Sequence, residues 1–399
     1  MKIGIVSETR NLESRTPLTP RTISELLDID RTLSFVVQPS NTRIIPDSEY
    51  LSSGAIVSSN LSDCDLILGV KEPSTASIIP NKHYFFFGHL DDKPPYNKEL
   101  FKALKERHIT FTDYELIKDN HGKRIIAFGY WAGISGVYDT LRLYGEKYGC
   151  YDLPKLNETF TKQMVLDNLA KVSHILLQRK VKILIIGYGR VASGVREILN
   201  AIGIKYTPAC KFKYIVNEET CYSIVGAADL TFDTYGYKFD PATFHANPER
   251  FASRFFPYAE TTDILLCCHC SQHGAPVYLD ERLVKGTKNR IRVVGDITCD
   301  VKGSVATTTR YSTHASPFYD IDHSLQEAKL FENSDNISVM AVDNLPNALA
   351  KEASEDFSDM VKRVVIDGVK ENAKYIQEAT MFVNGRLSDR YKNLNQYLM

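Results

Sequence analysis

Three glycines near the middle of the chain have a spacing that suits dinucleotide binding. Residues 187–194 (GYGRVASG) follow the apolar stretch Ile183–Ile186 and precede a helical pattern at Val195–Leu199. Glycine permits a tight turn and lets the backbone approach a diphosphate, and the start of the next helix offers N–H groups to the phosphates. A turn that only packs a helix on a sheet is the simpler alternative. The strand–turn–helix context favours binding of a nicotinamide dinucleotide by Gly187, Gly189, Arg190, Val191 and Gly194.

The sequence leaves the choice between NAD and NADP open. In this arrangement the next strand ends in Asp or Glu, which binds the adenosine ribose. Here the candidate strand Ile204–Thr207 leads into Pro208, and the next charged residues are Lys211 and Lys213. These lysines could accept a 2′-phosphate, or they could be ordinary surface residues.

Length and composition predict a globular protein of two domains. The chain has 399 residues, 43% of them hydrophobic, and its 48 basic and 49 acidic residues give a net charge of −1. This charge gives no support for nucleic acid or an anionic membrane as a partner. The chain opens on the strand-like run Lys2–Val6 without an apolar leader, and eight cysteines are typical of reduced thiols at this length. We expect a cytoplasmic protein with a small-molecule substrate, and its oligomeric state stays open.

Alternating strand and helix patterns predict two α/β domains. The first 136 residues contain five strand patterns and two helix patterns, and a long helix at Lys162–Leu177 leads into a second series of strands. Such alternation predicts two Rossmann-like domains with parallel sheets that flank an active-site cleft. We expect residues 137–344 to form the NAD(P)-binding domain. Residues 1–136 form the substrate domain, and the helical segments Asp356–Val369 and Glu371–Glu378 pack back on it, so that 345–399 join this domain. The expected strands are Lys2–Val6, Leu33–Val37, Leu66–Val70, His83–Phe87, Thr110–Thr112, Ile183–Ile186, Ile264–Cys268 and Ile291–Val294, and the two early helices are Thr22–Leu27 and Asn97–Glu106.

Six short motifs occur in order along the chain and together resemble one enzyme family. They are residues 13–20 (ESRTPLTP), 67–73 (ILGVKEP), 85–89 (FFFGH), 127–133 (AFGYWAG), 296–300 (DITCD) and 342–346 (VDNLP). The family comprises lysine-forming saccharopine dehydrogenase and lysine–2-oxoglutarate reductase, which are related to the N-terminal domains of alanine dehydrogenase and transhydrogenase. Residues 237–258 look more like the reductase domain of the bifunctional animal and plant enzymes, whereas residues 71–72 look more like the fungal dehydrogenase.

The resemblance implies an NAD(P)-dependent oxidoreductase that interconverts saccharopine with L-lysine and 2-oxoglutarate. Oxidation of a secondary amine and hydrolysis of the resulting imine need two general acid/base groups. Lys71 and His89 match that pair, and each follows an apolar strand. Glu72 and Glu115 match neighbouring acids that adjust the pKa of the pair and favour the charged form of the lysine. Without the resemblance, Lys71 would be read as a solvated strand end and His89 as a loop histidine.

Further residues are assigned a role by the same resemblance. Arg15 and Arg124 match arginines that bind substrate carboxylates, for which a guanidinium fork is well suited. The wall of the substrate site would include Phe128, Thr298, Cys299 and Asp300. Additional cofactor contacts would come from Cys270, Ile297, Val342, Asp343, Asn344 and Leu345.

Two departures from the family pattern put the substrate in doubt. Asp92 and Pro94 stand where the family has a lysine and a glutamine. Proline cannot replace the hydrogen bonds of glutamine, and the aspartate reverses a charge. A related opine or amino-acid dehydrogenase that acts on a different secondary amine is therefore an alternative. A catalytically silent nucleotide-binding sensor is a further one, because the ribose acid is missing.

The run Cys267-Cys268-His269-Cys270 has the residue types of a zinc site but not the geometry. Neighbouring side chains on a strand point to opposite faces of the sheet, so these four cannot converge on one ion. We expect a buried strand end and no metal.

Overall fold

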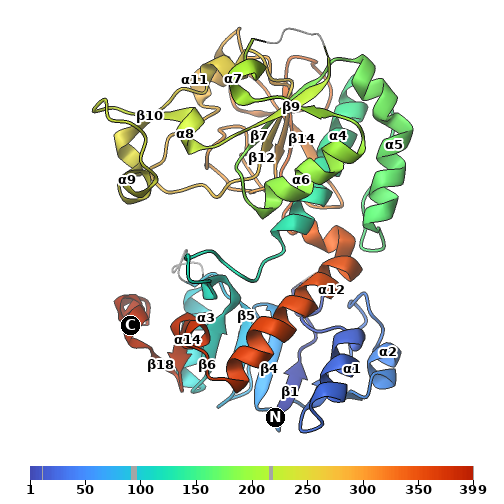
Figure 1. Ribbon diagram of the computed structural model, residues 1–399, viewed down its shortest axis with the longest axis vertical. Helices are drawn as coiled ribbons and strands as arrows, with labels where there is room; N and C mark the ends of the chain where they lie inside the picture. The colour runs from blue at the N-terminus through green and yellow to red at the C-terminus, as the bar shows by residue number, and fades with distance from the viewer. Residues whose placement is uncertain (11, 91–96, 215–218, 399) are drawn as a thin grey trace. The chain divides into compact units, whose positions relative to one another are not determined.

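Two eight-stranded sheets organise the chain (Figure 1). The computed structural model describes residues 1–10, 12–90, 97–214 and 219–398. Unit 1 consists of residues 1–128 and 350–399, and unit 2 consists of Gly129–Leu349. Most strands of each sheet are parallel to their neighbours, which confirms the predicted α/β fold with two Rossmann-like sheets.

The sheet of unit 1 has the strand order β18-β17-β6-β5-β4-β1-β2-β3. The strands from β6 to β3 are all parallel, whereas β17 and β18 add an antiparallel edge. Buried apolar runs such as Leu66–Val70 fill the strands because helices cover both faces of a parallel sheet. The bounds are β1 (Lys2–Ile5), β2 (Ser34–Val37), β3 (Ile56–Val57), β4 (Leu66–Lys71), β5 (His83–Phe87), β6 (Thr110–Asp113), β17 (Thr380–Val383) and β18 (Arg386–Leu387).

The C-terminal helices pack on the N-terminal part of unit 1. The backbone N–H groups of Thr16 and Thr19 donate to the hydroxyls of Ser354 and Ser358, over 3.0 and 2.9 Å. A π-helical turn, Val361–Ile366, continues α12 into α13. The helices of unit 1 are α1 (Pro20–Ile29), α2 (Asp47–Ser52), α3 (Lys98–Glu106), α12 (Ala350–Met360), α13 (Asp367–Lys370) and α14 (Lys374–Ala379).

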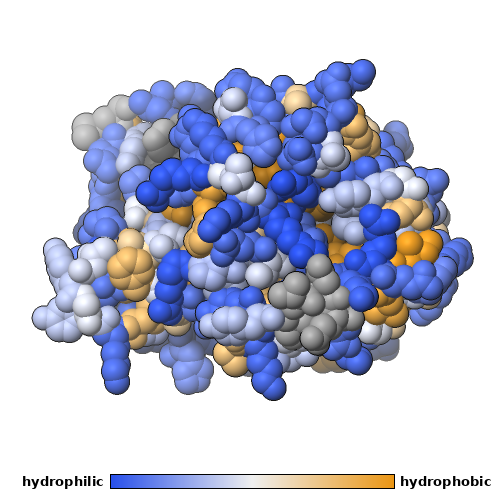
Figure 2. Space-filling view, turned by 90° about the horizontal axis from the view of Figure 1, so that it is seen from above, coloured by the Kyte–Doolittle hydropathy of each residue, from blue (hydrophilic) through white to orange (hydrophobic). Residues whose placement is uncertain are grey.

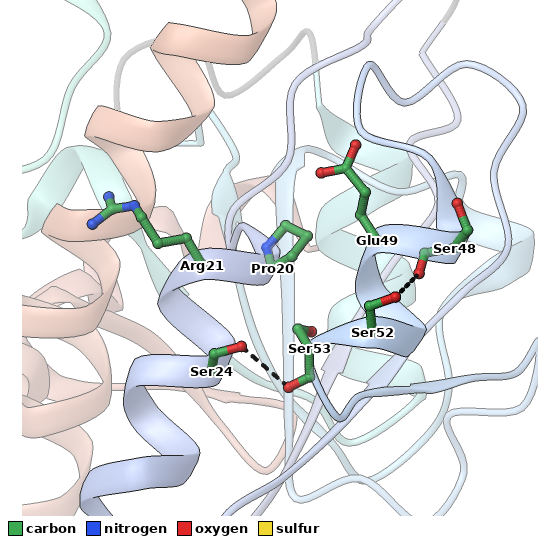
Figure 3. A pocket seen from close by; sticks show the side chains of 7 residues that line it. All are labelled: Pro20, Arg21, Ser24, Ser48, Glu49, Ser52 and Ser53. Carbon is green, nitrogen blue, oxygen red and sulfur yellow. Dashed lines mark hydrogen bonds between the residues drawn. The ribbon is translucent and has the colours of Figure 1, made fainter.

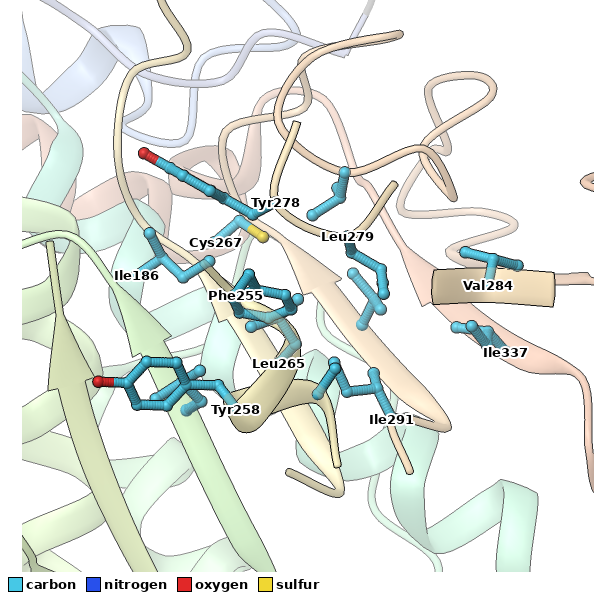
Figure 4. Close-up of a cluster of buried hydrophobic side chains, with 14 of the residues drawn as sticks. Ile186, Phe255, Tyr258, Leu265, Cys267, Tyr278, Leu279, Val284, Ile291 and Ile337 are labelled. Carbon is cyan, nitrogen blue, oxygen red and sulfur yellow. The ribbon is translucent and has the colours of Figure 1, made fainter. Parts of the chain in front are cut away.

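The sheet of unit 2 has the strand order β15-β14-β16-β13-β12-β7-β9-β8, and a separate two-stranded sheet joins β10 to β11. Figure 4 shows part of the core beneath β12, where Leu265 and Cys267 pack with Phe255, Tyr258 and Tyr278. The bounds are β7 (Lys182–Ile186), β8 (Lys205–Tyr206), β9 (Cys221–Val225), β10 (Thr231–Asp233), β11 (Phe251–Ser253), β12 (Ile264–Cys267), β13 (Val293–Asp296), β14 (Phe318–Ile321), β15 (Glu327–Ala328) and β16 (Ile337–Met340).

Helix α4 crosses α6 at a contact where both backbones come very close. A methyl group on Gly133 would lie 2.1 Å from the carbonyl oxygen of Val191, and one on Gly194 would lie 2.2 Å from that of Tyr130. Gly194 therefore has a packing role besides its place in the glycine turn. The helices of unit 2 are α4 (Gly129–Tyr148), α5 (Lys162–Gln178), α6 (Arg190–Ala201), α7 (Ala209–Phe212), α8 (Ala227–Leu230), α9 (Pro241–Ala246), α10 (Phe256–Ala259) and α11 (Glu281–Lys285).

The predicted strands and early helices agree with the structure to within two residues at either end. The helix α4 was not predicted, because every residue from 133 to 145 is buried and no polar face marks the helical period. This helix lies wholly in unit 2. The edge strands β17 and β18 were missed as well.

The face shown in Figure 2 is mostly hydrophilic, and hydrophobic side chains lie on it in small separate groups. Within the described ranges, no helix has both the length and the apolar character needed to cross a bilayer.

We expect Gly194→Ala to destabilise the protein by about 1–3 kcal/mol, because the added methyl group overpacks the α4–α6 contact. Urea unfolding followed by circular dichroism measures the change. Gly189→Ala is the matched control, since Gly189 has a negative φ and a methyl group added there would have no atom within 4 Å. Equal free energies of unfolding for the two variants would contradict the packing role.

Candidate active site

The carboxyl ends of four neighbouring strands bring the predicted acid/base residues of unit 1 to one edge of its sheet. Strands β1, β4, β5 and β6 are parallel, so their ends meet at the same edge. Lys71 ends β4, His89 follows β5 by two residues, and Glu115 follows β6 by two. The structure thus gathers three residues that are far apart in the sequence.

Two buried side chains hold the turn that carries His89. The backbone N–H of Gly88 donates to Asp113 Oδ2 over 3.0 Å, and Asn97 Nδ2 donates to the carbonyl of Gly88 over 2.6 Å. His89 itself has a φ of 51°, a left-handed conformation that is uncommon for residues other than glycine. These contacts fix the ring at the sheet edge despite that unfavourable backbone geometry.

Glu115 links His89 to Arg124. Its Oε2 lies 3.1 Å from His89 Nδ1, and its Oε1 lies 3.4 Å from Arg124 Nη1. The hydrogen bond to Glu115 raises the pKa of His89, although burial and the charge of Lys71 oppose this. Burial alone would raise the pKa of Glu115, but the contacts with His89 and the charges of Arg124 and Lys71 lower it overall. The imidazole is therefore held in its protonated form to a higher pH than usual.

Asp113, which is buried, and Glu8, which is half-buried, are two acids at this edge that the sequence analysis missed. Burial, together with the charge of Glu115, raises the pKa of Asp113 to about 7. Burial raises the pKa of Glu8 to about 8, and the charge of Glu13 adds to the effect. Their positions in the sequence could have identified them, because both acids stand at or just after the end of a strand in the parallel part of the sheet.

Glu8 holds the end of the strand that carries Lys71. Its carboxylate accepts the backbone N–H groups of Val70 and Lys71 over 2.6 and 3.0 Å. The pairing of β4 with β5 shifts register between Leu68 and Lys71, so the last residues of β4 need partners outside the ladder. Glu8 supplies them and sets the direction in which Lys71 leaves the sheet.

Arg15 is buried and already engaged by a neighbouring acid. Its Nε and Nη2 donate to the two carboxylate oxygens of Glu13 over 2.8 and 2.7 Å, and its side chain is 2% exposed. The guanidinium carbon lies 4.1 Å from the ring centroid of Phe128, which in turn stacks on Phe357.

The carboxylate of Glu72 has an oxygen atom whose lack of a partner suggests a place for a ligand. Its Oε2 is inaccessible to solvent and has no hydrogen-bond partner among the described residues. A buried carboxylate oxygen without a partner is costly, and a donor group of a bound molecule would relieve the cost. Glu72 thus adjoins Lys71 with an unused acceptor.

A hollow of about 350 Å³ between α1 and α2 does not belong to this edge (Figure 3). Arg21, the one basic residue in its lining, is paired with Glu25 and Asp359. None of the predicted site residues lines it; the lining is Pro20, Arg21, Ser24, Ser48, Glu49, Ser52 and Ser53.

The glycine turn of unit 2 fits a diphosphate. Gly187 has a φ of 110°, and a side chain there would meet the carbonyl oxygen of Cys268 at 2.8 Å, so only glycine is compatible with the turn. Gly189 caps α6 without a side chain, and the space that a side chain would fill there is open to at least 4 Å. The N-terminal turn of this twelve-residue helix presents its N–H groups beside that open space.

The other predicted cofactor and substrate residues of unit 2 follow strands parallel to β7. The loop after β13 is tied down by Asp296, whose Oδ1 accepts from the backbone N–H groups of Thr298 and Cys299 over 3.2 Å. Cys299 has a φ of 55°, and its Sγ donates to the carbonyl of Val342 over 3.0 Å. This hydrogen bond joins the loop after β13 to the loop after β16 at the edge of the sheet. Ile297, Val342 and Leu345 are buried there, Cys270 and Asp343 are exposed, and Thr298, Asp300 and Asn344 are half-buried.

The strand beside β7 is not the one that the sequence suggested. The strand β9 pairs with β7, and β8, at the predicted position 204–207, pairs only with β9. In this fold a ribose-binding acid would therefore follow β9 and not the strand that ends near Thr207. Asp229 is the first carboxylate after β9, and its Oδ2 accepts from the backbone N–H of Gly226 and the hydroxyl of Tyr188, the middle residue of the glycine turn.

The cysteine run after β12 forms a strand end, as expected. Cys267 and Cys268 are buried, and the backbone N–H of Cys268 donates to the carbonyl of Ile186 on β7 over 2.8 Å. Across the described residues, no three His, Cys, Asp or Glu side chains are grouped so that they could hold a metal ion.

We expect Glu115→Gln to lower the pKa of His89, because the substitution removes the negative charge that stabilises the imidazolium. NMR titration of the imidazole signal, assigned through its loss in His89→Gln, measures the shift. Glu72→Gln is the control, since Glu72 is not among the main causes of the shift at His89. An unchanged pKa in Glu115→Gln would refute the assignment.

The comparison of this chain with known protein families supports the resemblance that the sequence motifs indicated. Residues 4–135 match the model of the alanine dehydrogenase/PNT N-terminal domain. The chain is 30% identical to alpha-aminoadipic semialdehyde synthase of Arabidopsis thaliana, over 98% of this chain and 41% of that protein. It is 27% identical to the mitochondrial enzyme of that name from Bos taurus, over 96% of this chain and 46% of that protein. The chain thus spans less than half the length of these curated relatives.

A shorter relative matches along nearly its whole length. Saccharopine dehydrogenase (NAD(+), L-lysine-forming) of Candida glabrata is 26% identical, over 88% of this chain and 87% of that protein. Among solved structures, an L-alanine dehydrogenase superposes with a TM-score of 0.67 at 16% identity, over 100% of this chain and 99% of that one. A transhydrogenase from Sinorhizobium meliloti gives 0.60 at 14%, over 97% and 98%. The likeness to these two structures shows a shared fold.

These matches agree with the resemblance seen in the motifs: over most of its length the chain is similar to the lysine-forming saccharopine dehydrogenases and the alpha-aminoadipic semialdehyde synthases, and residues 4–135 match the alanine dehydrogenase/PNT N-terminal domain.

Proposed function

We propose that the chain is an NAD(P)-dependent oxidoreductase that acts on the CH–NH bond of saccharopine and interconverts it with L-lysine and 2-oxoglutarate. The observation that carries the proposal is the gathering of Lys71, His89 and Glu115 at one carboxyl edge of a parallel sheet. This is the edge at which α/β proteins bind ligands. The homology with saccharopine dehydrogenases supports the same reaction.

The proposed reaction consumes water and releases a proton. Hydride leaves the glutamyl carbon of saccharopine for the bound nicotinamide, which is the chemistry the cofactor supplies. The resulting C=N bond takes up water, and cleavage of the C–N bond then gives lysine and 2-oxoglutarate. Lys71 and His89 accept and return the protons at the nitrogen and at the water. Glu115 holds His89 in place through the 3.1 Å hydrogen bond to Nδ1, which leaves Nε2 for the substrate.

The charges around this pair suit a substrate with several carboxylates and an amine. Arg124 lies beside Glu115 and is 39% exposed, so it can meet a carboxylate that arrives from solvent. The unused acceptor of Glu72 suits a protonated amine. Arg15, braced by Glu13 and Phe128, is a further proposed substrate-binding residue. The resemblance to the family supports roles in substrate binding for Phe128, Thr298, Cys299 and Asp300 as well.

An opine or amino-acid dehydrogenase with a different secondary amine is the second candidate. The sequence observation in its favour is the pair Asp92 and Pro94, which lies outside the described residues. A panel of amines and oxo acids, assayed for reductive coupling, distinguishes the two enzymes. We place either activity in the cytoplasm, which the eight free cysteines support.

We expect purified protein to reduce NAD⁺ or NADP⁺ with saccharopine, seen as absorbance of the reduced nicotinamide. Lys71→Met and His89→Gln should each lower kcat by about 100-fold or more, because each removes a general acid/base group. Lys105→Met and His108→Gln are matched controls in the same unit, and His108, like His89, has a positive φ. No turnover in either direction with either cofactor would refute the saccharopine assignment. Cofactor binding that persists without any turnover across the substrate panel would favour a silent sensor.

We expect Asp229→Asn to shift cofactor preference toward NADPH, whichever cofactor the wild type prefers. The strand order supports Asp229 as a ribose-binding acid, since it is the first acid after β9, the strand beside β7, and a carboxylate there would repel a 2′-phosphate. Asparagine can still accept the N–H of Gly226, so the turn should remain intact. Fluorescence titrations with NADH and NADPH give the ratio of the two Kd values. Asp280→Asn, a helix cap at the start of α11, controls for general effects. An unchanged ratio would remove Asp229 from the cofactor site.

A further inference from the structure

Asp113 is a buried acid whose two carboxylate oxygens bind different turns at the active-site edge of unit 1. The residue ends β6 and is 1% exposed. Its Oδ2 accepts the backbone N–H of Gly88 over 3.0 Å, and its Oδ1 accepts the backbone N–H of Glu115 over 2.9 Å. Gly88 directly precedes His89. One carboxylate therefore restrains the backbone of both residues that form the His89–Glu115 hydrogen bond.

The pairing of β5 with β6 brings Asp113 to the turn before His89. The two strands are parallel, and Phe86 stands opposite Asp113 in their register. Gly88 thus lies just beyond the end of the ladder, and its N–H needs a partner that the strand no longer supplies. A methyl group on Gly88 would lie 3.1 Å from Asp113 Oδ2 and 2.8 Å from the ring of Phe111, so the turn fits tightly against β6.

On its other side, Asp113 caps the short 3₁₀ turn Tyr114–Leu116. An aspartate that accepts the N–H two residues further on is a common way to begin such a turn. The side chain of Glu115 leaves this turn and places its Oε2 3.1 Å from His89 Nδ1. The cap therefore helps to set where the carboxylate of Glu115 stands relative to the imidazole.

A second buried side chain restrains the histidine but not its acid. Asn97 Nδ2 donates to the carbonyls of Gly88 and His89, over 2.6 and 3.3 Å. With the N–H of Gly88 bound to Asp113, the turn is held through both a donor and an acceptor of its backbone. These bonds explain how His89 keeps a φ of 51°. Asp113 differs from Asn97 because it also binds the turn of Glu115.

The charges around His89 make the position of Glu115 measurable. Glu115, Lys71 and Asp113 all affect the pKa of His89, and the hydrogen bond from Glu115 has the largest effect. Burial and the charge of Glu115 raise the pKa of Asp113 to about 7, whereas the two backbone N–H groups favour its ionised form. That form has a free acceptor on each oxygen, as the two bonds require.

We propose that Asp113 is a positioning residue for the acid/base chemistry of unit 1, because its carboxylate holds the turns of His89 and Glu115 at the separation that their hydrogen bond requires. Asp113 acts through these two residues and not through a contact with the substrate. The inference rests on the proposed function where it concerns turnover. The part that concerns the hydrogen bond stands on the geometry of unit 1 alone.

The first test is Asp113→Asn, which keeps the size of the side chain but offers one acceptor oxygen in place of two. The kcat with saccharopine should fall by about 10- to 100-fold, the order of effect of a small misplacement of a catalytic group. The KM for saccharopine and the Kd for NADH should stay within about twofold of the wild type, because substrate and cofactor do not touch Asp113. NMR titration should show a lower pKa of His89, because Glu115 is no longer held beside it.

A double-mutant cycle separates positioning from a direct effect of the Asp113 charge. Asp113→Asn should lower the pKa of His89 much less in the Glu115→Gln background than in the wild type, because the acid that Asp113 positions is already gone. Equal shifts in the two backgrounds would show that Asp113 acts on the imidazole as an independent charge. That result would overturn the proposal.

Glu115→Asp tests the same proposal without disturbing Asp113, so it applies even where Asp113→Asn is too unstable to purify. The variant keeps the charge and shortens the side chain by one methylene group. If the backbone at position 115 is held, the shorter carboxylate cannot reach Nδ1, and the pKa of His89 should fall toward its value in Glu115→Gln. A wild-type pKa of His89 in Glu115→Asp would show that the turn moves freely, which would also overturn the proposal.

Asp320→Asn is the matched control. Asp320 is a fully buried aspartate of unit 2, and its Oδ2 accepts the backbone N–H of Phe331 over 2.8 Å. This variant should have a lower melting temperature, with the kcat and the pKa of His89 unchanged. An equal loss of kcat in Asp320→Asn and Asp113→Asn would show a general effect of a lost buried carboxylate and would overturn the proposal. Absence of turnover in the wild type would refute the proposed function instead, and the titrations of His89 would still decide the role of Asp113.

Discussion

Parallel pairing of the central strands is the constraint on which the remaining structure depends. When neighbouring strands run in the same direction, all their carboxyl ends meet at one edge, and whatever follows each strand is brought there. In unit 1 this edge gathers Lys71, His89 and Glu115. In unit 2 the same rule gathers the glycine turn, the cysteine run and the loops after β13 and β16. In both units the direction of the strands brings these residues together.

Burial of acids at that edge sets the electrostatics of unit 1. Glu8 and Asp113 are both desolvated, and their pKa values rise to about 8 and about 7. Glu115 has more positive neighbours, and its pKa falls instead. Acids within one small region are thus divided into readily protonated and readily ionised groups, a division that often accompanies acid/base chemistry. The same buried carboxyls also fix backbone, since Glu8 holds the end of β4 and Asp113 holds the turn before His89.

Local patterns were reliable where one segment carried the whole signal. The apolar run before Gly187 and the glycine spacing predicted the turn and its strand, and apolar runs predicted the strands that lead to Lys71 and His89. Features that depend on contacts between distant segments could not be predicted from the sequence. The helix α4 is buried along thirteen consecutive positions and has no polar face, and β17 joins its sheet from the far end of the chain. In the sequence Glu8 could not be distinguished from a surface acid, because its partners Val70 and Lys71 lie more than sixty residues away.

The sequence by itself determined the α/β class, the glycine turn with its strand and helix, the resemblance to known dehydrogenases and the strand ends near Lys71 and His89, because apolar periodicity and glycine spacing are properties of short segments. Only the tertiary structure decided that β9 rather than β8 lies beside β7, that Glu13 binds Arg15, and that His269 lies beside the glycine turn. Strand order, ion pairing and burial depend on which distant segments meet. Their energies come from contacts that no local pattern encodes.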